Sequence, residues 1–220
     1  MERIRELHPA AFLFDLDGTL IDSEMLWARA IVGWLADNGI AAETNAIAAL
    51  VFGHSWRDIH ASLLEHFPSL PKRFADQDAI GLRAHYNRIS SDPRAIVIPA
   101  AAEFYREAAK LAPCAIVSGS PHSDVETAAR LCGIERETAF VLGMEDYANG
   151  KPAPDGYLAA AARLGADPAH CIVIEDSTAG VKSGIAAGMK VIGIDRNPVI
   201  RQDFTGCAIT VSDLSEFIRR

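Results

Sequence analysis

The sequence AFLFDLDGTL, residues 11–20, decides the fold of this chain. Its apolar start is too short for a helical stripe and predicts a buried strand that ends near Asp15. Open sheets of parallel strands bind ligands at the carboxyl ends of their strands. Residues two apart in a strand face the same side, so we expect Asp15 and Asp17 to act on one substrate. Two carboxylates this close repel each other unless a cation lies between them. Such a pair with a metal can attack phosphorus and manage the leaving-group proton.

Beyond residue 96 the sequence alternates between short apolar runs and segments of helical period. Strands are predicted over 114–117, 140–142, 171–174, 190–194 and 208–211. Helices are predicted over 100–111, 123–132, 155–164, 177–187 and 214–219. This alternation predicts an α/β fold, a Rossmann-like parallel sheet with helices on both faces.

Residues 22–92 contain no strand-like run and are predicted to form a small helical cap domain. The α/β core domain then takes residues 1–21 and 93–220. Ser23 is a good N-cap for a helix over 24–38 that Gly39 ends. Further cap helices are predicted over 44–52, 55–66 and 74–89.

The composition is that of a globular protein and excludes several classes of partner. Half of the 220 residues are hydrophobic and 23% are charged. The net charge of −8 argues against a nucleic-acid partner. We expect no membrane partner and a cytoplasmic location, because no apolar run of 18 residues and no signal-peptide core is found. The four cysteines lack CxxC spacing and are expected to be buried free thiols. A monomer is favoured, with a dimer as the alternative.

Polar residues follow several predicted strands and should meet at one edge of the sheet. They are Ser118 and Gly119 after 114–117, Glu175 and Asp176 after 171–174, and Lys151 in the loop 149–155. Together they supply a hydroxyl, an ammonium and carboxylates for a hard cation. Magnesium prefers oxygen ligands and keeps several waters, which suits such a site. Each of these residues alone is typical of a helix cap, a turn or the surface. Only their combination at one edge of the sheet indicates a functional site.

Four stretches in order resemble the four motifs of the haloacid dehalogenase superfamily. They are FDLDGTL, IVSGS, GKPAPD and IEDSTAGV, and the resemblance covers essentially the whole chain. The chain is similar to members with a helical cap after the first motif, which include β-phosphoglucomutase and many sugar-phosphate phosphatases. Four motifs in order at compatible spacing are a specific signal.

The resemblance implies a role for each motif residue. Asp15 is the nucleophile that forms an aspartyl-phosphate. Asp17 is the general acid and then the general base, and its backbone carbonyl ligates magnesium. Asp15 and Asp176 are the other metal ligands, and Glu175 supports the Mg²⁺ through its water shell. The phosphoryl group is held by Ser118, Gly119 and Lys151.

Within the cap, Gly53 breaks the helical pattern and polar and aromatic residues follow. The segment resembles the loop by which helical caps of this family reach the substrate. We therefore expect His54, Trp56 and Arg57 to face the substrate. A surface ion pair is the alternative for Arg57. For His122, which lies close after the second motif, the sequence leaves two roles equally open: a substrate contact and a surface position.

The reaction is inferred from the first motif and the cap. Dehalogenases of this family lack the second aspartate of the motif, so Asp17 favours phosphoryl transfer. Mutases similar to β-phosphoglucomutase usually carry a histidine where this chain has Trp27, and a basic residue in the cap loop near Trp56. The sequence thus predicts a magnesium-dependent phosphatase that acts on a small phosphorylated metabolite, a sugar or sugar-alcohol phosphate. The alternatives are a phosphomutase and, in another class, a non-catalytic binding protein.

Overall fold

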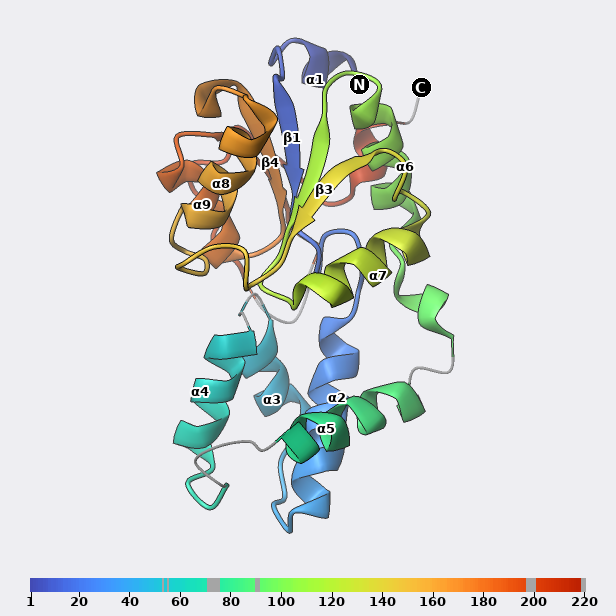
Figure 1. Cartoon of the computed structure of the whole chain (residues 1–220), viewed down its shortest axis with the longest axis vertical. Helices are drawn as coiled ribbons and strands as arrows, with labels where there is room; N and C mark the ends of the chain where they lie inside the picture. The colour runs from blue at the N-terminus through green and yellow to red at the C-terminus, as the bar shows by residue number, and fades with distance from the viewer. Residues whose placement is uncertain (53, 55, 71–75, 90–91, 197–200, 219–220) are drawn as a thin grey trace.

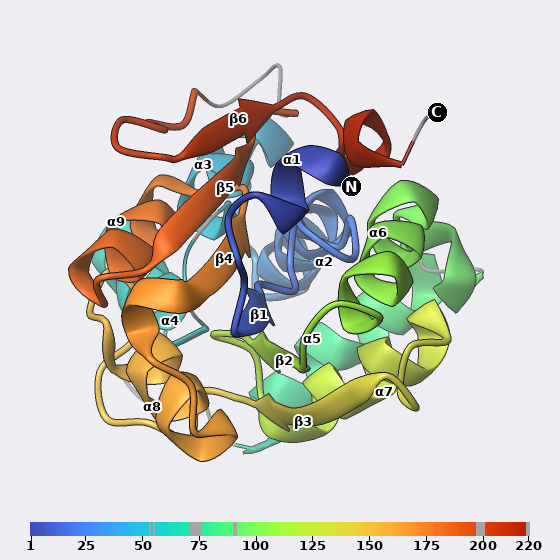
Figure 2. The same ribbon diagram turned by 90° about the horizontal axis from the view of Figure 1, so that it is seen from above.

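A computed structural model describes residues 1–52, 54, 56–70, 76–89, 92–196 and 201–218 of the chain. Its centre is a six-stranded parallel sheet in the order β3-β2-β1-β4-β5-β6 (Figures 1 and 2). The strands are β1 Ala11–Phe14, β2 Cys114–Val117, β3 Thr138–Leu142, β4 Cys171–Glu175, β5 Lys190–Ile194 and β6 Ile209–Val211. The predicted α/β fold is confirmed, and β1 lies in the middle of the sheet between β2 and β4.

The central strands are apolar on both sides because helices cover both faces of the sheet. Phe12 and Phe14 of β1 belong to one hydrophobic cluster, while Ala11 and Leu13 belong to the other. Figure 2 shows the two layers on either side of the sheet. The first layer contains α1 Glu2–Arg5, α6 Pro99–Ala109, α7 His122–Cys132 and the 3₁₀ turn Leu214–Phe217, and the second contains α8 Asp155–Leu164 and α9 Thr178–Ala186.

The helices of residues 24–89 form a second body beside the carboxyl edge of the sheet (Figure 1). They are α2 Glu24–Asp37, α3 Thr44–Val51, α4 Trp56–His66 and α5 Asp76–Ile89. They have a hydrophobic cluster of their own, separate from the two clusters of the sheet. The chain enters and leaves this body at one place, since the Asp22 amide donates to the Ile96 carbonyl over 2.7 Å and the Ile98 amide to the Leu20 carbonyl over 3.0 Å.

Short elements are where the sequence prediction differs from the structure. Helix α1 and the 3₁₀ turns Pro93–Ile96 and Pro168–His170 were not predicted, and the helix expected over 214–219 is a 3₁₀ turn over Leu214–Phe217. One turn of helix shows no periodicity that a sequence pattern can detect. Ends of the longer elements differ by a residue or two, as is usual for helix boundaries.

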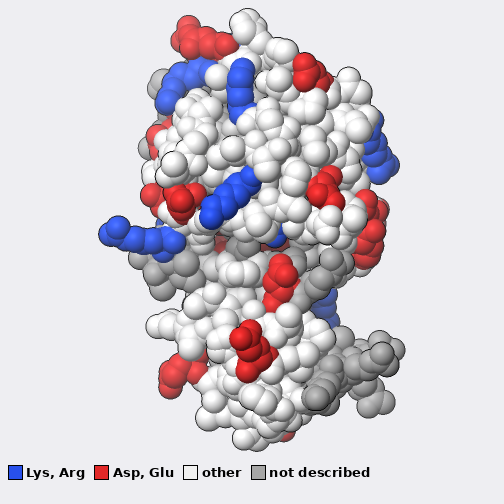
Figure 3. All heavy atoms as spheres, turned by 90° about the vertical axis from the view of Figure 1, so that its left-hand side faces the viewer, with Lys and Arg blue, Asp and Glu red and all other residues white. Residues whose placement is uncertain are grey.

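The cysteines follow the expected pattern. All four cysteines are free thiols, of which Cys114, Cys132 and Cys171 are buried and Cys207 is partly buried. Within the described residues, we find no helix with the length and apolar character needed to cross a membrane. On the face in Figure 3, acidic and basic side chains are mixed over the upper body, whereas the charged side chains of the lower body are mostly acidic.

The packing of the first layer makes a stability prediction. Phe104 is fully buried, with ring centroids 6.0 Å from Phe14 and 5.4 Å from Phe217. We expect Phe104→Ala to lower the free energy of unfolding by about 3–5 kcal/mol, because it leaves a cavity in the core. Leu158→Ala, at a 40% exposed position of α8, is the control and should cost less than about 1 kcal/mol. Urea denaturation measures both, and equal losses would contradict this packing.

Candidate active site

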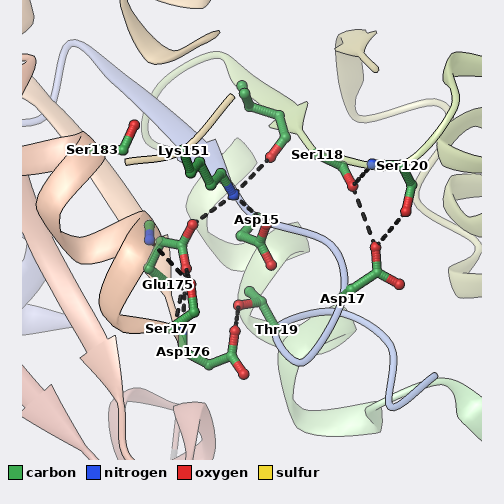
Figure 4. A network of polar contacts seen from close by, with 12 residues as sticks. Asp15, Asp17, Thr19, Ser118, Ser120, Lys151, Glu175, Asp176, Ser177 and Ser183 are labelled. Atoms are coloured by element: carbon green, nitrogen blue, oxygen red, sulfur yellow. Dashed lines mark hydrogen bonds and ion pairs between the residues drawn. The ribbon is translucent and has the colours of Figure 1, made fainter. Parts of the chain in front are cut away.

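The loop that follows β1 carries the first two candidate residues. The strand ends at Phe14, so Asp15 and Asp17 both lie beyond it. The expectation that strand alternation aligns their side chains is therefore wrong. Instead, Gly18 at φ +88° turns the chain sharply after them, and Figure 4 shows Asp17 pointing away from Asp15. Both aspartates still line one small cavity of about 50 Å³.

Lys151 lines the same cavity and joins Asp15 to Glu175 (Figure 4). Its ammonium donates to Asp15 Oδ1, to Glu175 Oε1 over 2.6 Å and to the Val117 carbonyl over 3.3 Å. The Tyr157 hydroxyl donates to the same Glu175 oxygen over 2.7 Å. Burial disfavours the ammonium, but Asp15 and Glu175 outweigh it and hold the pKa of Lys151 well above its usual range. Lys151 is thus a fixed positive charge between two strand ends.

Glu175 is held on its other side by the start of α9. Its Oε2 accepts the Asp176 amide over 3.2 Å, the Ser177 amide over 3.3 Å and the Ser177 hydroxyl over 3.0 Å. A Cβ at Gly180 would lie 1.8 Å from the Glu175 carboxyl group. Glycine is therefore required at position 180 for α9 to approach this carboxylate.

Asp176 faces the loop after β1. The Thr19 hydroxyl donates to its Oδ1 over 3.3 Å, and a Cβ at Gly18 would lie 2.0 Å from its Oδ2. Gly18 thus serves both the turn and the approach of this carboxylate. Burial, then the charges of Glu24 and Glu175, raise the pKa of Asp176 well above its usual value.

Three of these carboxylates form a cluster that a cation would fit. Asp15, Glu175 and Asp176 each present an oxygen, and these oxygens lie within 4.8 Å of one another. Burial raises the pKa of Asp15 well above 3.8, against the opposing charge of Lys151, and the two neighbouring carboxylates raise it further. One ammonium cannot balance three ionised carboxylates, so the buried cluster must take up either protons or a cation. A hard divalent cation such as Mg²⁺ suits both the charge and the oxygen donors.

Asp17 has different surroundings, made of hydroxyl groups. Its Oδ1 accepts from Ser23 over 2.5 Å, and its Oδ2 accepts from Ser120 over 2.7 Å and from Ser118 over 3.3 Å. Ser23 stands before α2 as expected, but its side chain makes no bond to the helix backbone. The predicted capping role of Ser23 is thus wrong, because its hydroxyl is used by the carboxylate of Asp17.

Ser23 and Ser120 are functional candidates that the sequence reasoning missed. Ser120 stands two residues after Ser118 in the stretch IVSGS, and that spacing is the signal from which it could have been found. Gly119 lies between them and also lines the cavity. No pattern indicated that Ser23 has a functional role, because a serine before a helix is typical of an N-cap. In the structure Ser118 contacts Asp17, and its role in holding phosphoryl oxygens stays a prediction.

Two of the cap candidates line the cavity beside Asp15. His54 is exposed, and its Nδ1 lies 2.9 Å from the Phe52 carbonyl oxygen. The Trp56 ring lies edge-on to Trp27, with centroids 4.6 Å apart. Arg57 belongs to α4, but its side chain lies outside what the structure describes, as does Gly53.

His122 lies outside this cavity. It begins α7, and its Nδ1 is 2.6 Å from Asp146 Oδ2. The hydrogen bond to Asp146 raises the pKa of His122 above 6.5. Its ring is therefore committed to a neighbouring surface carboxylate, which agrees with the surface role that the sequence left open.

Comparison with known proteins agrees with this geometry. The chain belongs to the haloacid dehalogenase-like hydrolases, whose family model matches residues 9–188. It is 35% identical over 185 residues to hexitol phosphatase A of Escherichia coli K12, covering 84% of this chain and 82% of that protein.

Solved structures extend the similarity. A haloacid dehalogenase family hydrolase from Deinococcus radiodurans R1, with bound phosphate and sodium, superposes with a TM-score of 0.70 at 28% identity, covering 96% of this chain and 94% of that one. A β-phosphoglucomutase from Clostridium difficile has a TM-score of 0.78 at 22% identity, covering 94% and 92%, and shares the fold. The resemblance of the four motifs is confirmed at the level of the family.

The excess charge of the cluster predicts how magnesium affects stability. The pKa values of Asp15 and Asp176 are raised in the folded state. Without a cation, the free energy of unfolding therefore falls as the pH rises from the ordinary carboxyl pKa toward these raised pKa values. Mg²⁺ replaces the protons and should raise the melting temperature more at about pH 8 than at about pH 5. At one hundred times its dissociation constant it adds about 2.7 kcal/mol.

Two variants control this measurement. Asp176→Asn removes one member of the cluster and should lose most of the shift with Mg²⁺. Glu103→Gln, an exposed carboxylate on α6, should keep all of it. Equal shifts in both variants would contradict a metal site in this cluster.

Proposed function

We propose that this chain is a magnesium-dependent phosphatase that hydrolyses a phosphorylated sugar or sugar alcohol through a phosphoryl group carried on Asp15. One observation supports this most: two carboxylates line one cavity in different chemical settings. Asp15 is paired with the ammonium of Lys151, whereas Asp17 accepts three hydroxyl hydrogen bonds. Carboxylates in different environments can serve as nucleophile and as proton donor.

In the first step, an oxygen of Asp15 attacks phosphorus and the bond from phosphorus to the leaving-group oxygen breaks. Asp17 gives its proton to that oxygen, so an alcohol departs. In the second step, Asp17 takes a proton from water while the water oxygen attacks phosphorus, which releases inorganic phosphate and restores Asp15. Lys151 holds Asp15 in place, and the hydroxyls of Ser23 and Ser120 fix Asp17. Orientation of this kind contributes much of the rate of phosphoryl transfer.

The carboxylate cluster would hold the metal. Asp15 and Asp176, with Glu175 behind them, are its proposed ligands. When bound, Mg²⁺ supplies positive charge to neutralise the phosphoryl oxygens.

The substrate class rests on the relatives and on the cap. Hexitol phosphatase A is named for a sugar-alcohol phosphate. Mutases similar to β-phosphoglucomutase usually place a histidine where this chain has Trp27, which is 9% exposed within the cap cluster. A side chain without a titratable group there favours hydrolysis over the mutase alternative.

The products distinguish these functions. With glucitol 6-phosphate and Mg²⁺, we expect one inorganic phosphate for each glucitol formed, and no turnover after chelation. Phosphate release is measured colorimetrically and the sugar by mass spectrometry. With glucose 1-phosphate, an isomerised sugar phosphate without free phosphate would support the mutase, and no turnover of any phosphate ester would support a binding protein.

Asp17→Asn tests the proton donor. We expect a loss of about 10²–10⁴-fold in kcat for glucitol 6-phosphate, the usual size for a general acid. The loss should be much smaller for p-nitrophenyl phosphate, since nitrophenolate leaves without a proton. Asp167→Asn, at an exposed position, is the control and should change neither rate. Equal losses for both substrates would contradict the role of Asp17.

A further inference from the structure

A second and larger cavity adjoins the first between the cap and the sheet domain. It has a volume of about 360 Å³, against about 50 Å³ for the cavity at Asp15. The residues that line both are Asp17, Ser23, Trp27, Trp56 and Ser120. The small cavity has room for about three to five water molecules, whereas small-molecule sites usually have about 300–1,000 Å³. A phosphoryl group fits the first, and the leaving group, which Asp17 must reach, fits the second.

Aromatic rings from three cap helices form one wall of the larger cavity. The Trp27 ring of α2 stacks on Tyr86 of α5 at 4.0 Å with an interplanar angle of 24°. Trp56 of α4 lies edge-on to Trp27. Small polar groups, among them Asn87 and Thr127, line the cavity as well. Apolar rings with a few polar groups are typical of a site for a small organic molecule.

Two charged groups of the lining are paired with each other. Among the described residues of the lining, Arg83 is the one cation, and Asp17 and Asp124 are the acids. Arg83 of the cap donates to Asp124 of α7 over 2.5 Å, and its guanidinium lies 4.9 Å from the centroid of the Trp27 ring. The guanidinium thus spans the cap and the sheet domain, with its charge already matched by Asp124.

We infer that the Arg83–Asp124 pair makes this cavity select an uncharged, polyhydroxylated leaving group and discriminate against one that carries a carboxylate or a second phosphate. This inference rests on the proposed phosphatase function. An anionic group would have to take the guanidinium from Asp124 and would lie near two carboxylates. Hydroxyl groups can instead donate to Asp124 and accept from Arg83 without breaking the pair. Repulsion of the wrong ligand is a common source of specificity.

Two substrates of the same length test this inference. Glucitol 6-phosphate and 6-phosphogluconate differ at the carbon farthest from phosphate, which is an alcohol in one and a carboxylate in the other. The wild-type enzyme should have the higher kcat/KM for glucitol 6-phosphate. Asp124→Asn frees Arg83, so the ratio of kcat/KM for 6-phosphogluconate to that for glucitol 6-phosphate should rise about fivefold, the size expected for a partly exposed charge contact.

Two further variants make the result specific. Glu126→Gln makes the same chemical change on α7 at a side chain that is 51% exposed and does not line the cavity, and its ratio should equal that of the wild type. Arg83→Gln combined with Asp124→Asn removes both charges, so the gain of the single variant should disappear. Melting temperatures establish that each variant is folded.

The outcomes separate this inference from the function beneath it. An unchanged ratio in Asp124→Asn, or the same gain in the double variant, would overturn the role of the pair while phosphate release continued. No release of phosphate from any ester by the wild-type enzyme with Mg²⁺ would overturn the proposed function, and this inference with it.

Discussion

The ammonium of Lys151, held between the carboxylates of Asp15 and Glu175, makes the interaction on which the rest of the site depends. Buried charges are costly unless they are paired and hydrogen-bonded, and removing one partner leaves the other uncompensated. The fold stabilises the carboxylate of Glu175 with the Tyr157 hydroxyl and the amides at the start of α9, and the glycine at position 180 lets α9 approach it. What remains is negative charge at the end of two neighbouring strands, and this is where a cation and a phosphoryl group are expected to bind.

Two carboxylates at this edge of the sheet have different surroundings. Asp15 lies in the acidic cluster beside the ammonium of Lys151. Asp17 accepts hydrogen bonds from the hydroxyl of Ser23, which precedes α2, and from serine hydroxyls that follow β2. The two cavities divide along this line, because Asp15 lines only the small one and Asp17 lines both. Under the proposed function, chemistry at phosphorus belongs to the small cavity and recognition of the leaving group to the larger one. The helices of residues 24–89 line the larger cavity with Trp27, Trp56 and Arg83.

Much of this arrangement could be predicted from local patterns. The apolar run before Asp15 predicted the central strand, and polar residues after 114–117 and 171–174 predicted the edge where they meet. The hydrogen bond from Ser23 to Asp17 could not be predicted, because a serine before a helix has the same sequence pattern whether its hydroxyl caps the helix or binds a carboxylate. The Arg83–Asp124 contact joins residues 41 apart, and no local pattern encodes which exposed arginine of a helix meets which aspartate of another body. Strand alternation predicts Asp17 on the same side as Asp15, but the strand ends at Phe14, before both residues.

Detection of the phosphoryl group on Asp15 tests the central claim most directly. A single turnover of phosphorus-labelled substrate with Mg²⁺ is stopped in acid within milliseconds, and the labelled peptide is mapped by mass spectrometry. We predict that the label lies on Asp15 of the peptide with sequence AFLFDLDGTL, and that Asp15→Asn, which removes the negative nucleophile, neither carries label nor turns over. Label on another residue, or wild-type turnover by Asp15→Asn, would contradict the covalent mechanism and the role of Lys151 within it.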